Sequence, residues 1–527
     1  MNHRPLLGLA LTLLSGLQAT AGTTFRIKFN PATRPEPATG RLVLMLIKDG
    51  TGVAPGTDPL DGPFWGKNQP MFGTDVKDLA PNVFVNIDDS ATSFPDVPSK
   101  LAPGTYHVQA RLDVVRRDSE WKREKGNLFS KNQTFTVTSN FDKPVEITLD
   151  QVTPGETQTP PAGCEVFEVR SKLLSDFRGY DVMLRAAVVL PTNRDAGRSY
   201  PAVYEVPGFG GNHTSAYRVA QGMGRGKDNL ADSPKTVLHA SAFWITLDPE
   251  SSNGHTLFAD SANNGPCGKA LVEELIPALE KKYNLAAKPA ARLLRGHSSG
   301  GWSTLWLAIT YPETFGATWS TSPDPVDFRR FQVVDIYGQP NMYTKTIFGE
   351  HVPAERPSTR EGGRETMTIR EENTIEEVIG PKNTSSQQWD SWQAVFGPRE
   401  KDGKVAALYD ARTGMLDKAV AETYRDYDIA EIFRKEPGKI GVIFHQRVRL
   451  IVGDQDTFYL NEAVALLKPE VEKLSFFQYP EGRNGYIKIV PGKDHGNIFA
   501  TPEMNAVPAE MVEHLKKNGL IEARAAK

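Results

Sequence analysis

A serine between closely spaced glycines is the residue of this chain best suited to chemistry. Residues 296–300 read Gly-His-Ser-Ser-Gly, which places Ser298 in a G-x-S-x-G pattern. Residues 291–295 have the composition of a short strand, and residues 301–308 can form a helix. A strand, a sharp turn and a helix are the context in which this pattern presents a nucleophilic serine. The flanking glycines are required because larger side chains would clash where the strand and the helix pack closely.

A nucleophilic serine needs a base, and the base needs a carboxylate that fixes its tautomer. Downstream of Ser298 the apolar run 448–452 ends in Gly-Asp-Gln-Asp, so two carboxylates, Asp454 and Asp456, follow a predicted buried strand. We favour Asp456, because a G-x-x-D turn lets the chain leave the strand before the side chain points back. Asp454 remains the alternative.

Only two histidines, His495 and His514, follow these aspartates. His514 lies in an amphipathic helical pattern, which predicts a surface histidine. His495 lies in the turn-rich segment 491–497, directly after the strand-like run 486–490. A loop after the last strand suits a catalytic histidine, so we predict that His495 is the base.

The oxyanion of an acyl-transfer reaction needs two N–H donors, one of them on the residue after the nucleophile. That residue is Ser299. The second donor is expected on a loop after an early strand, and residues 202–206 form such a strand before Pro-Gly-Phe-Gly-Gly at 207–211. The backbone N–H of Phe209 is our candidate.

Several stretches of the chain resemble one known family: residues 204–211, 255–261, 271–277, 296–301, 453–460 and 494–495. The sequence is similar to the putative esterase family of α/β-hydrolases, which includes esterase D (S-formylglutathione hydrolase), feruloyl esterases, enterochelin esterases and the mycolyltransferase antigens. The resemblance covers roughly residues 165–325 and 440–520. It implies an α/β-hydrolase fold with Ser298 as nucleophile, Asp456 as acid and His495 as base. The family's G-x-x-D-x-F pattern supports Asp456 over Asp454.

Composition sets the outer bounds. The chain has 527 residues, with 61 basic and 64 acidic side chains, so nothing in its charge argues for nucleic-acid binding. Residues 1–21 read as a signal peptide: a basic start, an apolar run at 6–17 and small residues at 19–21. The apolar run is too short to span a membrane, so we expect a secreted or periplasmic protein. Two cysteines, Cys164 and Cys267, permit one disulfide or two free buried thiols.

The region before the resemblance has the pattern of a β domain. Short apolar-alternating runs separated by Pro, Gly and Asp recur at 24–29, 41–46, 83–87, 106–114, 133–137 and 145–149. They predict an Ig-like β-sandwich over residues 22–150. The Pro- and Thr-rich residues 151–163 read as a linker.

Residues 164–527 predict an α/β domain with a mostly parallel sheet, since strands and helices alternate. The segment 268–283 carries an apolar stripe and predicts a helix on this sheet. The charged segment at about 325–438 breaks the alternation, and we expect it to form a cap over the site. Trp392 and Phe396 are candidates to line the pocket beneath it, or else core residues of the cap.

These patterns together predict an exported serine esterase that needs no cofactor and has no metal site. Its substrate is expected to be a small-molecule or polysaccharide-linked ester. An acyltransferase with the same triad, a serine peptidase and a non-catalytic glycan-binding protein are the alternatives. The natural ester and the oligomeric state are not set by the sequence.

Overall fold

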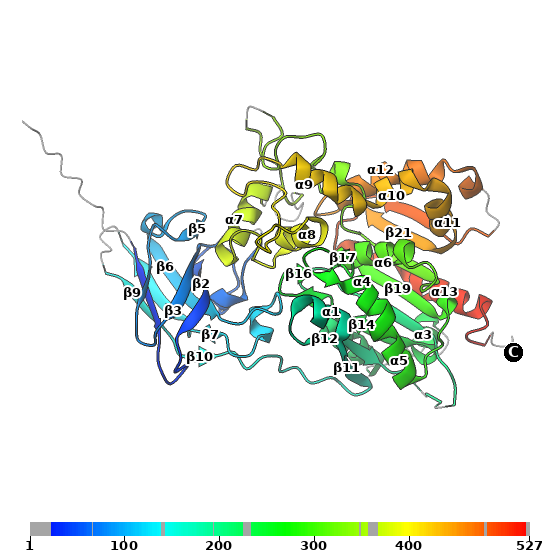
Figure 1. Ribbon diagram of the computed structural model, residues 1–527, viewed down its shortest axis with the longest axis horizontal. Coiled ribbons are helices and arrows are strands. Elements are labelled where there is room, and N and C mark those ends of the chain that lie inside the picture. Colours follow the sequence, from blue (N-terminus) through cyan, green and yellow to red (C-terminus); the bar gives the residue numbers. More distant parts are fainter. Residues whose placement is uncertain are drawn as a thin grey trace, which may run out of the picture.

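The computed structural model describes residues 23–65, 67–138, 143–192, 194–195, 197–224, 233–346, 349–356, 367–478 and 482–522. The chain has a mixed α/β fold, with a β-rich N-terminal part beside a larger α/β part (Figure 1). The predicted signal peptide, residues 1–21, lies outside the described residues. No helix in the described ranges is long and apolar enough to cross a membrane.

The N-terminal part contains two sheets. One has the order β4-β1-β9, and the other has the order β10-β7-β6-β2-β3-β5 with β8 paired to β6. Side chains from both sheets, including Phe25, Leu44 and Ile147, share one apolar cluster. The strands are β1 (Phe25–Phe29), β2 (Ala38–Lys48), β3 (Met71–Leu79), β4 (Val85–Ile87), β5 (Thr92–Phe94), β6 (Gly104–Asp113), β7 (Leu128–Phe129), β8 (Gln133–Val137), β9 (Val145–Leu149) and β10 (Gln151–Val152).

The start of the expected linker differs from the prediction. Gln151 and Val152 form β10, which pairs antiparallel with β7, so they belong to the N-terminal sheet. Residues 153–160 then run without helix or strand to β11 (Cys164–Ser171). The Pro- and Thr-rich composition did not reveal the pairing because its partner, β7, is only two residues long.

The α/β part is built on an eight-stranded sheet of order β11-β12-β14-β13-β19-β20-β21-β22. The β11–β12 and β12–β14 pairs are antiparallel, and the remaining neighbours are parallel. After β11, the strands are β12 (Val182–Val189), β13 (Ala202–Val206), β14 (Phe243–Leu247), β19 (Arg292–His297), β20 (Ala317–Thr321), β21 (Val448–Gly453) and β22 (Tyr486–Val490). Four two-residue strands form small ribbons after β14: β15 (Glu250–Ser251), β16 (Gly254–His255), β17 (Asp260–Ser261) and β18 (Gly265–Pro266).

Helices cover both faces of this sheet, as parallel strands buried on two sides require. One apolar cluster joins the sheet to α5, α6, α11 and α12, and a second joins it to α2, α3 and α13. The helices outside the charged segment are α1 (Lys172–Arg178), α2 (Ala216–Gly224), α3 (Pro234–Ser241), α4 (Cys267–Ala270), α5 (Ile276–Tyr283), α6 (Ser299–Thr310), α11 (Pro437–Arg447), α12 (Leu460–Glu472) and α13 (Pro502–Lys517). Cys164 and Cys267 are both buried free thiols.

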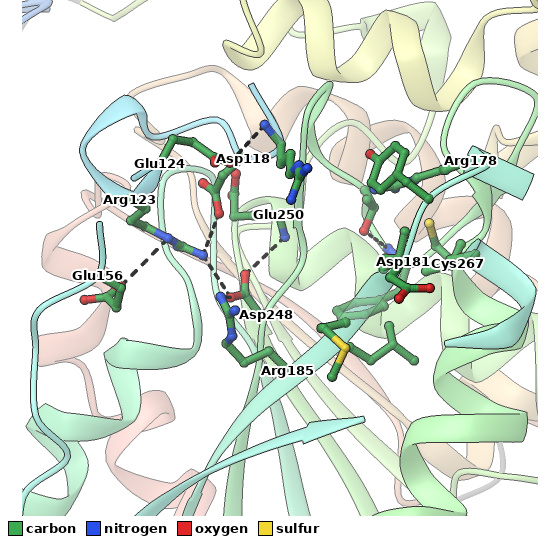
Figure 2. Close-up of a pocket in the computed structure, with 18 residues that line it drawn as sticks. Asp118, Arg123, Glu124, Glu156, Arg178, Asp181, Arg185, Asp248, Glu250 and Cys267 are labelled. Carbon is green, nitrogen blue, oxygen red and sulfur yellow. Dashed lines mark hydrogen bonds and ion pairs between the residues drawn. The ribbon is translucent and has the colours of Figure 1, made fainter. Parts of the chain in front are cut away.

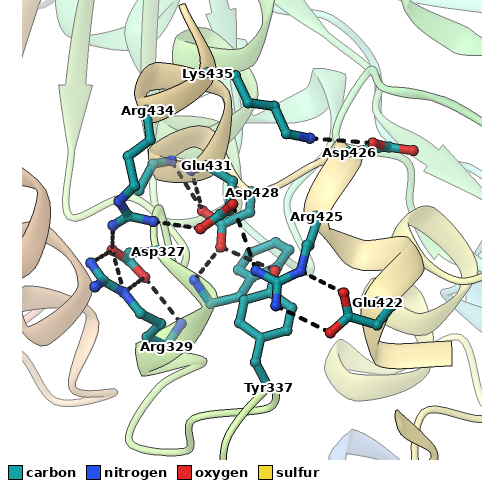
Figure 3. A network of polar contacts seen from close by, with 12 residues as sticks. Asp327, Arg329, Tyr337, Glu422, Arg425, Asp426, Asp428, Glu431, Arg434 and Lys435 are labelled. Atoms are coloured by element: carbon teal, nitrogen blue, oxygen red, sulfur yellow. Dashed lines mark hydrogen bonds and ion pairs between the residues drawn. The ribbon is translucent and has the colours of Figure 1, made fainter. Parts of the chain in front are cut away.

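The described residues between β20 and β21 form, before α11, the helices α7 (Ile369–Ile379), α8 (Gln388–Phe396), α9 (Lys418–Thr423) and α10 (Ile429–Lys435). A network of ion pairs fastens both ends of this segment to the sheet domain (Figure 3). Asp327, near its start, is fully buried and pairs with Arg434 near its end. Arg434 also donates to Glu470 on α12, with Nε 2.9 Å from Oε2. The segment therefore leaves and rejoins the domain at one fixed point.

The N-terminal part packs against this segment rather than standing apart from it. In Figure 1, α7 lies beside the N-terminal sheet. Arg41 of β2 is buried, and its Nε donates to the carbonyl of Val378 at 3.0 Å. Apolar side chains of both parts, among them Met45, Met71 and Ile375, form one cluster.

A second contact joins the N-terminal part to the α/β sheet (Figure 2). Arg123 Nη2 lies 2.9 Å from Asp248 Oδ2 at the end of β14 and 2.7 Å from Asp118 Oδ2. Glu250 lies in the same pocket and accepts a hydrogen bond from the Ser119 hydroxyl. The two parts thus meet through buried charged groups as well as apolar ones.

Candidate active site

Ser298 occupies the turn between β19 and α6. Its backbone angles, φ 59° and ψ −126°, lie in a region that is strained for a residue with a side chain. A Cβ at Gly300 would lie 1.9 Å from the Val206 carbonyl oxygen, and one at Gly296 would lie 2.1 Å from the Gly300 carbonyl oxygen. Both positions therefore accept only glycine, because the neighbouring strand β13 and the helix start leave no room.

His495 and Asp456 form a hydrogen-bonded pair. The His495 Nδ1 lies 2.8 Å from Asp456 Oδ2, and Asp456 is completely buried. The other carboxylate oxygen of Asp456 accepts the Phe458 N–H at 3.0 Å, which fixes its orientation. Asp454 points elsewhere and accepts the Gly492 N–H at 2.7 Å. Of the two aspartates that the sequence offered, Asp456 is the one that contacts the histidine.

Ser298 and His495 line the same cavity, which has a volume of about 630 Å³. Asp456 lies behind His495, so the order from the cavity inward is serine, histidine, carboxylate. The cavity is also lined by Trp65, Phe209, Arg218, Asp324, Gln332, Glu355, Glu372, Gln388, Trp392, Phe458 and Phe499, among others. His514, by contrast, is not in this lining; its Nε2 lies 3.0 Å from the Ala290 carbonyl oxygen.

Aromatic rings hold His495 from two sides. The His297 ring centroid lies 4.3 Å from that of His495, and the Phe458 ring meets it edge-on at 4.9 Å. Burial lowers the pKa of His297 well below its usual range, and the nearby His495 lowers it further. His297 is therefore neutral and lies tilted against His495, with 40° between the ring planes, without competing for its proton.

The glycine-rich loop after β13 reaches the nucleophile. A Cβ on Gly208 would lie 3.2 Å from the Ser298 Cβ, so the loop backbone passes directly beside the serine. Within the described residues, the Phe209 N–H has no hydrogen-bond partner. Ser299 is the first residue of α6, and an N–H in the first helical turn has no partner inside the helix. The two predicted oxyanion donors thus lie on segments that flank Ser298.

Two buried histidines, His255 and His213, lie at that loop, and the sequence analysis assigned no role to either. His255 Nε2 lies 3.0 Å from the Pro207 carbonyl oxygen, and burial lowers the His255 pKa to about 4. A neutral imidazole donates one N–H, which here goes to the loop. His213, just after the loop, places its Nδ1 2.8 Å from Asp248 Oδ2. Asp248 is the same carboxylate that Arg123 of the N-terminal part contacts.

Asp324 connects the nucleophile turn to the charged segment. Its Oδ2 accepts hydrogen bonds from the Ser299 hydroxyl and the Trp392 indole N–H, each at 2.7 Å. Burial raises the pKa of Asp324 to about 6, although these two hydrogen bonds act in the opposite direction. Trp392 lines the cavity, while Phe396 packs in a core of aromatic rings that includes Trp302 and Phe328. The two candidate aromatics therefore divide between pocket and core.

Several residues that line the cavity lie outside the sequence motifs and were not predicted. Trp65 belongs to the N-terminal part and was not singled out, nor were Gln332, Gln388 and Asp324. None lies in a pattern with chemical meaning, and only the fold brings them together. In the described part of the chain, no group of three or more His, Cys, Asp or Glu side chains is arranged to hold a metal ion.

Part of the chain is similar to a known protein family. Residues 181–423 match a family model described as "Putative esterase". That part of the chain is therefore similar to the putative esterase family. The match contains Phe209 and Ser298 and ends before Asp456 and His495. A search of curated proteins finds no match to the chain.

Several solved structures are also similar to the chain, at low identity. A ferulic acid esterase is 12% identical, with 66% of this chain and 98% of that chain covered and a TM-score of 0.38. The S-formylglutathione hydrolase from Agrobacterium tumefaciens is 14% identical, with 68% and 98% covered and a TM-score of 0.37. Est1E from Butyrivibrio proteoclasticus is 13% identical, with 67% and 99% covered and a TM-score of 0.33. The match to the family model, and not the likeness to these structures, supports an ester-cleaving hydrolase.

Proposed function

We propose that this protein hydrolyses carboxylic esters through an acyl-enzyme on Ser298. The observation that carries the proposal is the 2.8 Å contact between His495 and the buried Asp456, at the wall of a cavity that Ser298 also lines. A buried carboxylate on Nδ1 leaves Nε2 as the acceptor for the serine proton.

In the first step the Ser298 hydroxyl oxygen attacks the ester carbonyl while His495 Nε2 takes its proton. The tetrahedral intermediate collapses, and His495 returns the proton to the departing alcohol. Water then attacks the acyl-enzyme with His495 again as the base, which releases the acid and restores the serine. Asp456 keeps the imidazole oriented and stabilises its charged form.

The backbone N–H groups of Phe209 and Ser299 are proposed as the oxyanion donors. Support comes from the close approach of the Gly208 backbone to Ser298 and from the unpartnered Phe209 N–H in the described structure. Each such donor contributes about 10²–10³-fold to the rate in comparable enzymes.

The architecture we propose is an α/β-hydrolase with an N-terminal β-sandwich and an inserted cap. The eight-stranded, mostly parallel sheet with the serine after β19 supports the hydrolase fold. Two sheets around one apolar cluster support the sandwich, and the position of Trp392, Gln388 and Glu372 in the cavity lining supports the cap. The pattern of residues 1–21 supports export as a further part of the proposal.

The test is hydrolysis of p-nitrophenyl esters of increasing acyl length by the wild type, Ser298→Ala and Ser303→Ala. Ser303 is a matched control because its hydroxyl bonds to the Ser299 carbonyl within α6 and it does not line the cavity. We expect activity to vanish in Ser298→Ala and to persist in Ser303→Ala. A folded wild type that cleaves none of these esters, or a Ser298→Ala variant that keeps full activity, would contradict the proposed mechanism.

A further inference from the structure

The cap side of the catalytic cavity carries polar side chains that have no partner. Gln332 is 2% exposed, and its Oε1 makes no hydrogen bond to any described residue. The Nε2 of Gln388 is likewise buried without a partner in the described structure. Both side chains line the cavity. Buried carboxamides are normally hydrogen-bonded, because leaving their polar atoms unpaired costs folding free energy.

These two glutamines are tied to the nucleophile by short chains of contact. Gln388 and Trp392 are four residues apart on α8, so they lie on the same face about 5–6 Å apart. Trp392 bonds to Asp324, which bonds to the Ser299 side chain next to the nucleophile. Gln332 follows Phe331, whose ring lies 5.0 Å from that of Trp392. Both carboxamides therefore belong to the wall of the cavity that Ser298 also lines.

Two further lining groups, Glu372 and Trp65, contribute to the chemistry of the cavity. Burial raises the pKa of Glu372 to about 7, so near neutral pH its carboxyl can both donate and accept hydrogen bonds. Trp65 reaches the cavity from the N-terminal part and is 37% exposed, so it offers a flat apolar face at the rim. The two carboxamides and a partly protonated carboxyl can each donate and accept hydrogen bonds. They therefore suit an uncharged partner that has both donors and acceptors better than they suit an alkyl chain or a permanent cation.

We propose that Gln332, Gln388 and Glu372 form a subsite that binds an uncharged hydroxyl- or amide-bearing part of the ester, beside Ser298. This subsite rests on the proposed ester hydrolysis, since it names the substrate class of the same cavity. An arriving hydroxyl or amide would supply the hydrogen bonds that the two carboxamides lack. The free-energy gain on binding would then come from groups whose burial is unfavourable in the empty enzyme.

The first test compares acetate esters in which only the alcohol changes: butyl, 2-hydroxyethyl, 2-acetamidoethyl and choline acetate. A mirror set of methyl esters varies only the acyl side: butanoate, 3-hydroxypropanoate and 3-acetamidopropanoate. We expect the wild type to prefer a hydroxyl or acetamido member over its alkyl and cationic counterparts in at least one set. The set that shows the preference identifies whether the alcohol side or the acyl side of the ester binds the subsite. The better of the two polar members identifies whether a hydroxyl or an amide supplies the hydrogen bonds.

The second test uses Gln332→Met and Gln388→Met, which remove the carboxamide and keep the shape. Each should lower kcat/KM for the preferred polar ester by about 5- to 10-fold, the effect of one hydrogen bond, and leave the alkyl ester unchanged or faster. Gln393→Met is the matched control on α8. Both amide atoms of Gln393 are already paired, with Asn383 and with the Leu408 N–H, and it does not line the cavity.

Thermal stability gives a readout that does not depend on activity. Gln388→Met should raise the melting temperature, because an unpaired polar atom is removed, whereas Gln393→Met should lower it. If the wild type cleaves no ester, the proposed function fails, and the subsite is tested by binding instead. N-acetylethanolamine or glycerol should then raise the melting temperature of Ser298→Ala. Loss of this increase in the double variant Ser298→Ala/Gln388→Met supports the subsite. Equal kcat/KM for polar and alkyl esters, or a preference unaffected by both glutamine substitutions, would overturn the subsite.

Discussion

At the scale of single residues, local burial decides which of two neighbouring aspartates serves the histidine. Asp456 is completely enclosed, and its two oxygens are divided between His495 and the Phe458 N–H. Asp454, two positions earlier, instead closes a turn with Gly492. The strand end that precedes both was predictable from the apolar run 448–452. The choice between the two depended on a turn geometry that the sequence only suggests.

Substitution of each aspartate in turn tests which of the two serves His495. Asp456→Asn should lower kcat for ester hydrolysis by about 10³–10⁴-fold, because an amide favours the wrong histidine tautomer and cannot stabilise the charged ring. Asp454→Asn keeps an acceptor for Gly492 and should leave kcat within about threefold of the wild type. Steady-state kinetics at pH 7–9 measures both. A similar loss in the two variants would mean that Asp456 has no special role.

At the scale of elements, patterns in the sequence predicted the turns and strands that have a local signature. They missed short strands that form only by pairing with distant segments. The turn at Ser298 and the strands β8 and β9 follow from local glycine spacing and alternation. Strands β3, β5 and β7 were missed; β3 has an irregular burial pattern, and β5 and β7 have only three and two residues. The expected helix 268–283 contains a π-helical turn at Leu271–Leu275, just before Pro277, which has no N–H to continue an α-helical ladder.

The close approach of elements at the nucleophile turn gives the second prediction. Gly300→Ala places a Cβ 1.9 Å from the Val206 carbonyl oxygen on β13, an inner strand paired on both sides. Neither backbone can move freely, so we expect a loss of about 3 kcal/mol or more in the free energy of unfolding, or no soluble protein. Gly222→Ala in α2 meets no atom within 4 Å and should be neutral or slightly stabilising. Urea unfolding compares the two, and a soluble Gly300→Ala of wild-type stability would refute the packing argument.

At the scale of the whole molecule, the N-terminal part is joined to the catalytic part rather than tethered to it. Arg41 and the cluster around Met45 bind it to α7, Arg123 binds it to Asp248, and Trp65 enters the cavity. The sequence did not predict these contacts, because each pairs residues more than 100 positions apart, and neither partner carries a motif. Charged groups, among them Arg123, Asp248 and Glu250, are buried at this junction, and burial of a carboxyl makes stability depend on pH.

Glu250 at the junction provides the pH-dependent prediction (Figure 2). Burial raises its pKa from 4.5 to about 8, and Asp118 adds to the rise, while the Ser119 hydroxyl and Arg123 oppose it. Because the folded pKa lies above the unfolded one, the native state holds a proton that the unfolded chain has lost. The contribution of Glu250 to stability is therefore complete below about pH 4.5 and disappears as the pH rises through 8. The wild type should lose stability across this window, in part through Glu250.

Glu250→Gln should remove that loss, because a carboxamide keeps an acceptor for Ser119 and never ionises. We expect the variant to exceed the wild type by on the order of 2 kcal/mol in the free energy of unfolding at pH 8.5 and to match it near pH 4.5. Glu36→Gln, an equal change of charge on an exposed side chain, is the control and should shift stability little at either pH. Urea titrations at half-unit steps from pH 4.5 to 8.5 measure the difference. A Glu250→Gln curve parallel to that of the wild type would show that this carboxyl ionises in the native junction as readily as in the unfolded chain.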